Sequence, residues 1–174
     1  MEFEQGDAFN NETSLAADLA LIDHYDVVIR DLELTVLRRA RGHDLDSYER
    51  LKTIPGIGKV LALTILYEIH DIRRFASVGQ FVSYARLVRG SHESAGKVKG
   101  SPNKKIGNAH LKWAFSEAVP LLKRECPEAN ALAKRIEKKE NKARANSHLA
   151  VKLGRAVYYM LRKELAFDIG AFLK

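Results

Sequence analysis

The stretch IPGIGKVLALTILYEI, from Ile54 to Ile69, is the part of the sequence that decides the fold. Pro55 and Gly56 are typical of a tight turn, and Gly58 is suited to the start of the next helix. The residues that follow are strongly apolar over a length that favours a buried helix. A shorter helix is predicted just before the turn, at about 46–53. We therefore predict two helices joined by a glycine-containing hairpin.

This pattern resembles a helix-hairpin-helix motif at about residues 47–70. In that motif, glycines bring backbone N–H groups against a nucleic-acid phosphate at a helix N-terminus, where the helix dipole favours an anion. Gly56, Gly58 and Lys59 are therefore candidate nucleic-acid-binding residues. The alternative is a helix–turn–helix packing unit that contacts no ligand, because glycine turns are common.

The segment before the hairpin is predicted to be a long amphipathic helix at about 12–41, which follows a polar, frayed leader at 1–11 and which Gly42 ends. A strict heptad would place Asp26 and Glu33 in the seam, so a regular two-stranded coiled coil would be imperfect. We expect this helix to pack against another domain or a second protomer. Its apolar stripe consists of Leu15, Leu19, Ile22, Ile29, Leu32 and Val36.

The rest of the chain is also predicted to be helical, so the predicted fold class is all-α. Ser77 and Gln80 have the spacing of a capping box for a helix that ends near 87, and Asn108 is suited to cap another helix. Pro120 is expected to kink or split that second helix. A short hairpin within 88–106 is compatible with the pattern. Two further helices are predicted at about 128–140 and 147–165, the second of which buries Leu149, Leu153, Val157, Tyr158 and Leu161.

Charge is divided unequally along the sequence. The chain of 174 residues carries a net charge of +7, but residues 1–54 hold 6 Lys/Arg against 12 Asp/Glu, and residues 55–174 hold 23 against 10. A domain this basic is typical of a nucleic-acid-binding protein. We therefore divide the chain into an acidic leader with a coiled-coil-like arm, 1–43, and a domain that contacts nucleic acid, 44–174.

Composition and missing motifs exclude several other classes of protein. With 46% hydrophobic residues the chain can bury a core, and no apolar run is long enough to span a bilayer, so no membrane partner is expected. Cys126 is the only cysteine, which excludes an internal disulfide and favours a reducing, cytoplasmic location. The sequence contains no GxxxxGK loop, HExxH pair or GxSxG elbow, which disfavours nucleotide hydrolysis, zinc proteolysis and a serine hydrolase.

The segment YARLVRGSHESAGKVKGSPNKKIGNAHLKW, from Tyr84 to Trp113, is the candidate site. A long irregular segment within a helical domain is typically functional or disordered. A serine hydroxyl beside concentrated positive charge can act as a nucleophile on a phosphodiester. Charge alone does not distinguish Ser94 from Ser91 or Ser101, and a loop serine is more often a turn-former or a cap. The candidate cations and proton shuttles are Arg86, Arg89, Lys97, Lys99, Lys104, Lys105, His92 and His110.

Five blocks of sequence carry a resemblance to a known family: PGIGKVLALTIL, DIRRFASVGQFVSYARLV, ESAGK, KIGNAHLKWAFSEA and RAVYYMLRKELAFD. With these blocks, the chain from Leu51 to Asp168 resembles the C-terminal domain of insertion-sequence 110 family transposases, which are relatives of the Piv DNA invertase. The match is specific because it rests on the order and spacing of five blocks and not on a single motif.

The resemblance implies that Ser94, which precedes a small-Gly-Lys element, is the covalent nucleophile on DNA. It also implies an N-terminal RuvC-like domain, absent from this chain, whose acidic residues bind a divalent metal such as Mg²⁺. No metal or other cofactor is therefore expected in this chain. Full-length members recombine DNA as multimers guided by a structured bridge RNA. The helix at 12–41 is then the family's coiled-coil arm, through which we expect a homo-oligomer to form.

The sequence departs from the family pattern at several positions. Many members have Ser-Gly where this chain has Ser94, Ala95 and Gly96. Members often have Gly and Pro where this chain has Arg86 and Arg89. A helix that is usually continuous in the family contains Pro120 here.

Our first hypothesis is the C-terminal domain of a DNA transposase, which binds DNA and guide RNA and whose Ser94 attacks a phosphodiester. Arg89, Lys97 and Lys104 are the candidate charge-stabilising residues. The chain alone is expected to be inactive without the metal-binding domain. The alternatives are a non-catalytic nucleic-acid-binding module and an assembly domain of a transposase. The candidate nucleic-acid-binding residues are Gly56, Gly58, Lys59, Lys99, Lys105 and Lys112.

Overall fold

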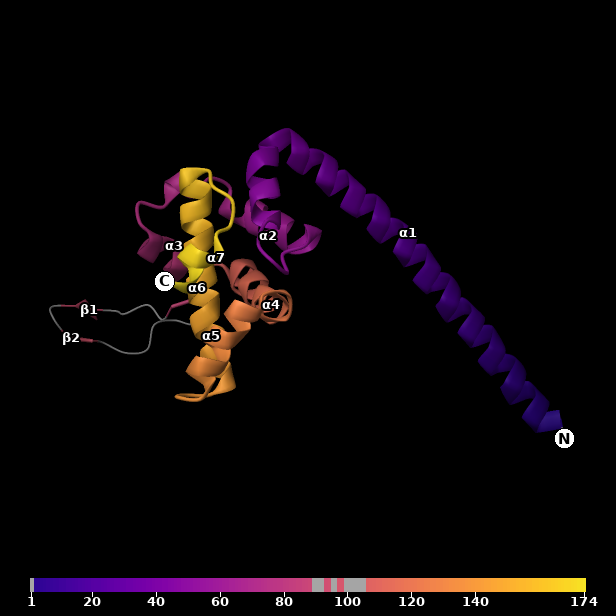
Figure 1. Cartoon of the computed structure of the whole chain (residues 1–174). Helices are drawn as coiled ribbons and strands as arrows, with labels where there is room; N and C mark the ends of the chain where they lie inside the picture. The colour runs from indigo at the N-terminus through magenta and orange to yellow at the C-terminus, as the bar shows by residue number, and fades with distance from the viewer. Residues whose placement is uncertain (1, 89–92, 95–96, 99–105) are drawn as a thin grey trace. The chain divides into compact units, whose positions relative to one another are not determined.

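The computed structural model describes residues 2–88, 93–94, 97–98 and 106–174, and of residues 2–12, 40, 41, 43, 93, 94, 97 and 98 it describes the backbone only. Across these ranges the protein has seven α-helices, one 3-10 helix and one ladder of two very short strands (Figure 1). The predicted all-α class is confirmed. The chain forms two compact units, Met1–His43 and Asp44–Lys174.

The first helix, α1 (Glu2–Lys52), is longer than predicted and is broken in its last part. It begins well before 12 and continues through Gly42, which we had expected to end it. The break lies instead at Asp44, whose backbone is extended with φ −159° and ψ 79°. The Asp44 carboxylate accepts a hydrogen bond from the backbone N–H of Ser47 at 2.9 Å, as an N-cap does. Asp44 therefore caps the start of a second helical segment, whereas Gly42 does not end the first.

Apolar side chains of the first unit are exposed along the predicted stripe. Ile22, Ile29 and Leu32 are each more than half exposed. Exposed apolar side chains that follow one another along a helix face form a patch of the kind that marks an interaction surface. The same face includes Leu15, Leu19 and Tyr25, which are exposed to a similar degree.

The second unit is built around α6 (Lys142–Lys163), which packs against α3 (Val78–Tyr84), α4 (Ala109–Glu125), α5 (Pro127–Glu137), α7 (Ile169–Leu173) and the 3-10 helix η1 (Ile72–Arg74). The remaining helix, α2 (Lys59–Ile69), packs against α4. Figure 1 shows α6 running through this unit beside α3, α5 and α7.

The buried face of α6 follows the predicted spacing. Leu149, Leu153 and Val157 are fully buried, as predicted, and each contributes about 1.5–3 kcal/mol by leaving water. The helix begins at Lys142, earlier than predicted, because the side chain of Asn141 caps it by accepting a hydrogen bond from Arg144 N–H at 2.9 Å. This earlier start places Arg144 within the first turn of α6.

Two of the predicted caps are confirmed. The hydroxyl of Ser77 accepts a hydrogen bond from Gln80 N–H at 3.3 Å, and the side-chain oxygen of Asn108 accepts one from Leu111 N–H at 2.9 Å. The Gln80 side chain closes the first cap by accepting from the N–H of Ala76 at 3.0 Å. However, α3 ends at Tyr84 and is shorter than predicted.

The predicted split at Pro120 is wrong, because α4 is one helix from Ala109 to Glu125. Proline removes the hydrogen bond to the carbonyl of Ser116, an exposed residue whose carbonyl water can reach. On the other face of the helix, Phe115, Val119 and Leu122 are fully buried. This apolar face holds the helix together across the proline.

The turn between the last segment of α1 and α2 depends on two different glycines. Gly56 has φ +83°, and a Cβ built on it would lie 2.6 Å from the Cβ of Leu121 in α4. Gly58 has an ordinary φ of −85°, and a Cβ on it would meet nothing within 4 Å. The first glycine is required by conformation and by close packing, whereas the second leaves open space in front of α2.

We predict that Gly56→Ala lowers the free energy of unfolding by about 2–4 kcal/mol, since alanine would combine a left-handed conformation with overpacking against α4. The matched variant Gly58→Ala should cost less than about 1 kcal/mol, because only its cap preference changes. Urea unfolding followed by circular dichroism measures both. Equal losses in the two variants would contradict this packing role.

Candidate nucleic-acid interface

In the hairpin turn, backbone N–H donors are open to an anion at the start of α2 but not at Gly56. The N–H of Gly56 donates to a carboxylate oxygen of Glu125 at 2.6 Å, so α4 already supplies the anion for this donor. In contrast, Gly58 and Lys59 are exposed at the start of α2, and none of the described side chains caps this helix. Uncapped N–H groups at a helix N-terminus attract phosphate. The structure therefore presents Gly58 and Lys59 to solvent and turns Gly56 toward the core.

The two ends of the segment that carries Ser94 are held together by Asn108. Its backbone N–H donates to the carbonyl of Tyr84 at 2.6 Å. Its side-chain amide donates to Glu68 at 2.6 Å and to the hydroxyl of Tyr84 at 3.3 Å. The chain between Tyr84 and Asn108 thus leaves and re-enters the helical domain at one point.

At the same point, one cation lies against an aromatic ring. The guanidinium of Arg74 lies 4.7 Å from the ring centre of Tyr84. The hydrogen bond from Asn108, and then the interaction with Arg74, lower the pKa of the Tyr84 hydroxyl below its usual value. Cation and phenol therefore stabilise each other beside the entry to the basic segment.

Ser94 lies in the short strand β1 (Glu93–Ser94), which pairs antiparallel with β2 (Lys97–Val98). The register makes Lys97 the cross-strand partner of Ser94. The ladder brings the predicted nucleophile and one predicted charge-stabilising residue together along the backbone. The other two charge-stabilising candidates, Arg89 and Lys104, lie outside the described residues, as do the nucleic-acid-binding candidates Lys99 and Lys105.

Lys112, the last of the predicted nucleic-acid-binding residues, is exposed near the start of α4. It lines a cavity of about 720 Å³ together with Arg86, Arg144 and His148. Arg144 and His148 were not predicted from the sequence to belong to the site. The sequence signal that could have revealed them is Asn141. As an N-cap it starts the helix early enough to place Arg144 and His148 one turn apart on α6.

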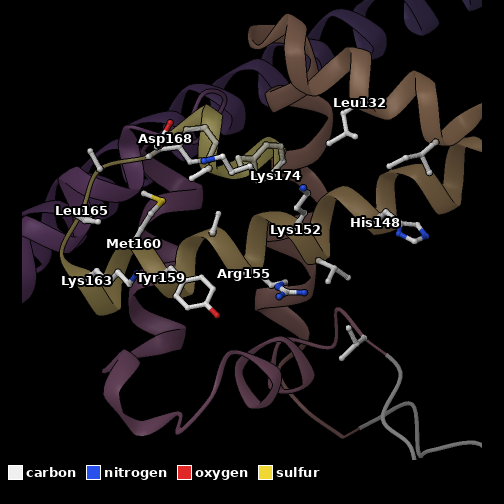
Figure 2. A pocket seen from close by; sticks show the side chains of 18 residues that line it. Leu132, His148, Lys152, Arg155, Tyr159, Met160, Lys163, Leu165, Asp168 and Lys174 are labelled. Carbon is white, nitrogen blue, oxygen red and sulfur yellow. The ribbon is translucent and has the colours of Figure 1, made fainter.

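A larger cavity of about 940 Å³ follows α6 toward α7 and is lined mainly by apolar side chains (Figure 2). Lys152 points toward α7, where its ammonium lies 5.7 Å from the ring centre of Phe172. Arg155 and Tyr159 point to the other side of α6 in the same view. None of the residues predicted from the sequence to bind nucleic acid lines this cavity.

Within the described ranges, no three His, Cys, Asp or Glu side chains gather as a metal ion would require. Of the helices in the same ranges, none combines the length and apolar character needed to cross a bilayer.

A known family resembles the central part of the chain. The profile of the Transposase IS116/IS110/IS902 family matches residues 48–134, which is half of the chain. No curated protein matches the chain. The matched range extends from the last part of α1 through the hairpin, α2, α3 and the Ser94 segment into α5. The chain therefore belongs to the IS116/IS110/IS902 family of transposases.

Proposed function

We propose that this chain is the domain of a DNA transposase that binds nucleic acid and provides Ser94 as the nucleophile of strand transfer. The observation that carries the proposal is the transposase match over 48–134, which includes both the hairpin and Ser94. The register of the ladder supports it, because a lysine, Lys97, pairs with the proposed nucleophile. A cation near the phosphodiester would stabilise the charge that develops during transfer.

The proposed reaction is a transesterification. The oxygen of Ser94 forms a bond to phosphorus, and the bond between phosphorus and one sugar oxygen of the strand breaks. The serine loses its proton, and the departing sugar oxygen gains one. A phosphodiester is present before and after the step, so the reverse attack can rejoin a strand without an external energy source. The family resemblance implies that an acidic domain would hold Mg²⁺ for this step.

Ser94→Ala is expected to abolish covalent protein–DNA adducts, because alanine has no nucleophilic oxygen. The measurement uses a protein that joins this chain to a metal-binding transposase domain, with labelled DNA and denaturing electrophoresis. Ser91→Ala and Ser101→Ala are the matched controls and should retain the adduct. An adduct that persists in Ser94→Ala would show that another residue is the nucleophile and would refute the assignment of Ser94.

Binding to DNA and to a guide RNA is proposed to use the exposed start of α2. The domain from 55 to 174 has 23 Lys/Arg against 10 Asp/Glu, which favours any polyanion. Gly58 leaves the backbone N–H groups accessible, and Lys59 adds a cation at the same helix end. Such a site contacts the phosphate backbone and not the bases, so it positions the strand without reading its sequence.

We expect the affinity for oligonucleotides of about 20 nucleotides to fall by about 10³–10⁵ between 50 and 200 mM salt, if six to ten phosphates are contacted. Lys59→Gln should weaken binding by about 3- to 10-fold and reduce the salt slope by about 1. Lys134→Gln, an equal charge loss on the exposed side of α5, should leave the slope unchanged. Fluorescence anisotropy with DNA and RNA probes measures these values, and an affinity that does not vary with salt would refute the proposed interface.

Self-association is proposed to use the exposed apolar face of the first unit. Burying Ile22, Ile29 and Leu32 against a second copy would remove apolar surface from water at about 25 cal/mol per Å². The face is broad, because Tyr25 lies beside the stripe and is also exposed. A broad face fits a helical bundle better than the narrow seam of a two-stranded coiled coil.

The double variant Ile22→Asp, Ile29→Asp is expected to shift the protein to a monomer, since two charges would be buried in the interface. Light scattering coupled to size exclusion gives the mass. The matched control Val27→Asp places the same kind of change on the opposite side of the helix and should keep the oligomer. A wild-type protein that is already monomeric would remove the proposed role of this face.

A further inference from the structure

We propose that the cavity bounded by Arg86, Lys112, Arg144 and His148 is a phosphate-binding pocket, which holds a backbone phosphate of a nucleic-acid strand. The inference rests on the proposed nucleic-acid binding and adds to it a second, distinct contact. The hairpin site lies at the start of α2, whereas this pocket lies between the end of α3, the start of α4 and the first turns of α6.

The side chains of the pocket fit an oxyanion. Three of its lining residues are cationic at neutral pH, and Ser116 adds a hydroxyl. Arg144 belongs to the first turn of α6, where the positive end of the helix dipole adds to its charge, and His148 follows one turn later. Among the described residues that line the pocket, Glu140 is the single carboxylate. The cavity of about 720 Å³ is also large enough for a phosphate with its attached sugar.

Arg86 is held in a conformation that an arginine rarely adopts. Its φ is +54°, in the left-handed region that favours glycine. Arg86 N–H donates to Ser83 at 3.0 Å and Leu87 N–H donates to Val82 at 2.9 Å, which is the hydrogen-bond pattern of a Schellman cap at the end of α3. Glycine is the residue that usually occupies this position in such a cap. The cap at the end of α3 therefore carries a long cationic side chain where a glycine would carry none.

Two glycines fix this strained residue in place. A Cβ on Gly154 of α6 would lie 2.5 Å from the side chain of Leu87. Leu87 can therefore pack against α6 only because residue 154 is a glycine. A Cβ on Gly107 would lie 3.0 Å from Cγ of Arg86 and 2.7 Å from the carbonyl of Tyr84. The absence of a side chain at Gly107 therefore leaves room for the stem of Arg86, which lines the pocket.

Glu140 occupies the pocket in the way that a phosphate would. One of its carboxylate oxygens lies 3.5 Å from Nη1 of Arg144, and the other lies 3.5 Å from Nε2 of His148. These are long contacts between exposed groups, and such pairs contribute little to stability. A phosphate could therefore displace the carboxylate at low cost and make shorter, charge-assisted hydrogen bonds. Glu140 therefore competes weakly with a bound phosphate for Arg144 and His148.

The test is the binding of a labelled single-stranded DNA of about 20 nucleotides to the full chain, measured over a range of salt concentrations. Arg86→Gly and Arg144→Gln should each weaken binding by about 5- to 10-fold and reduce the salt slope by about 0.7. Glu140→Gln should tighten binding by about 2- to 5-fold. Arg135→Gln, an equal charge loss at an exposed position of α5, should change affinity less than 2-fold and leave the slope unaltered.

Arg86→Gly also separates a binding role from a structural one. Glycine relieves the left-handed strain, so the midpoint of urea unfolding should rise while binding weakens. A fall in both would show that Arg86 supports the fold, which would overturn its role in the pocket.

The remaining outcomes separate this inference from the proposed function. If the wild type binds DNA but Arg86→Gly and Arg144→Gln bind like Arg135→Gln, the pocket inference alone fails. If the wild type binds no DNA, both fail. Inorganic phosphate, added at constant ionic strength, tests the source of the anion. If it raises the thermal midpoint of the wild type but not of Arg144→Gln, while both bind DNA equally, the pocket takes free phosphate and the assignment to a strand is overturned.

Discussion

The hydrogen bonds made by Asn108 are the constraint on which the functional part of the molecule depends. Its backbone N–H holds the carbonyl of Tyr84, its amide reaches Glu68 of α2, and its side-chain oxygen caps α4. One residue therefore joins three helices and closes the base of the segment that carries Ser94. Because that base is fixed, the ends of the segment do not need to be brought together when nucleic acid binds, which lowers the entropy cost of binding.

Local signals in the sequence predicted much of the helical domain. Ser77 and Asn108 cap helices as predicted, and Leu149, Leu153 and Val157 are buried because their spacing matches one face of a helix. The wrong predictions arose where the preference of a single residue type was outweighed by tertiary packing. Pro120 does not split α4, since the apolar face of that helix is buried along its whole length.

The candidate site was less predictable, because its residues come together only in the folded chain. Ser94 was chosen by resemblance to a family, since charge and spacing do not distinguish it from other serines. Arg144 and His148 approach Arg86 only through the packing of α6 against α3, which no local pattern in the sequence reveals. The strain at Arg86 was likewise invisible, because a backbone angle depends on the cap and on two distant glycines.

The turn at Gly56 has a consequence for how this domain can be divided. The motif looks local, since two short helices and a glycine turn lie within a few dozen residues. Yet its left-handed glycine rests against Leu121, and its N–H is bonded to Glu125, far along the chain. A peptide excised from this region would lack both the packing against Leu121 and the Glu125 carboxylate that accepts from Gly56. The same holds for these residues grafted onto another scaffold. The hairpin is therefore not a transferable module, and any engineered fusion has to keep α4 with it.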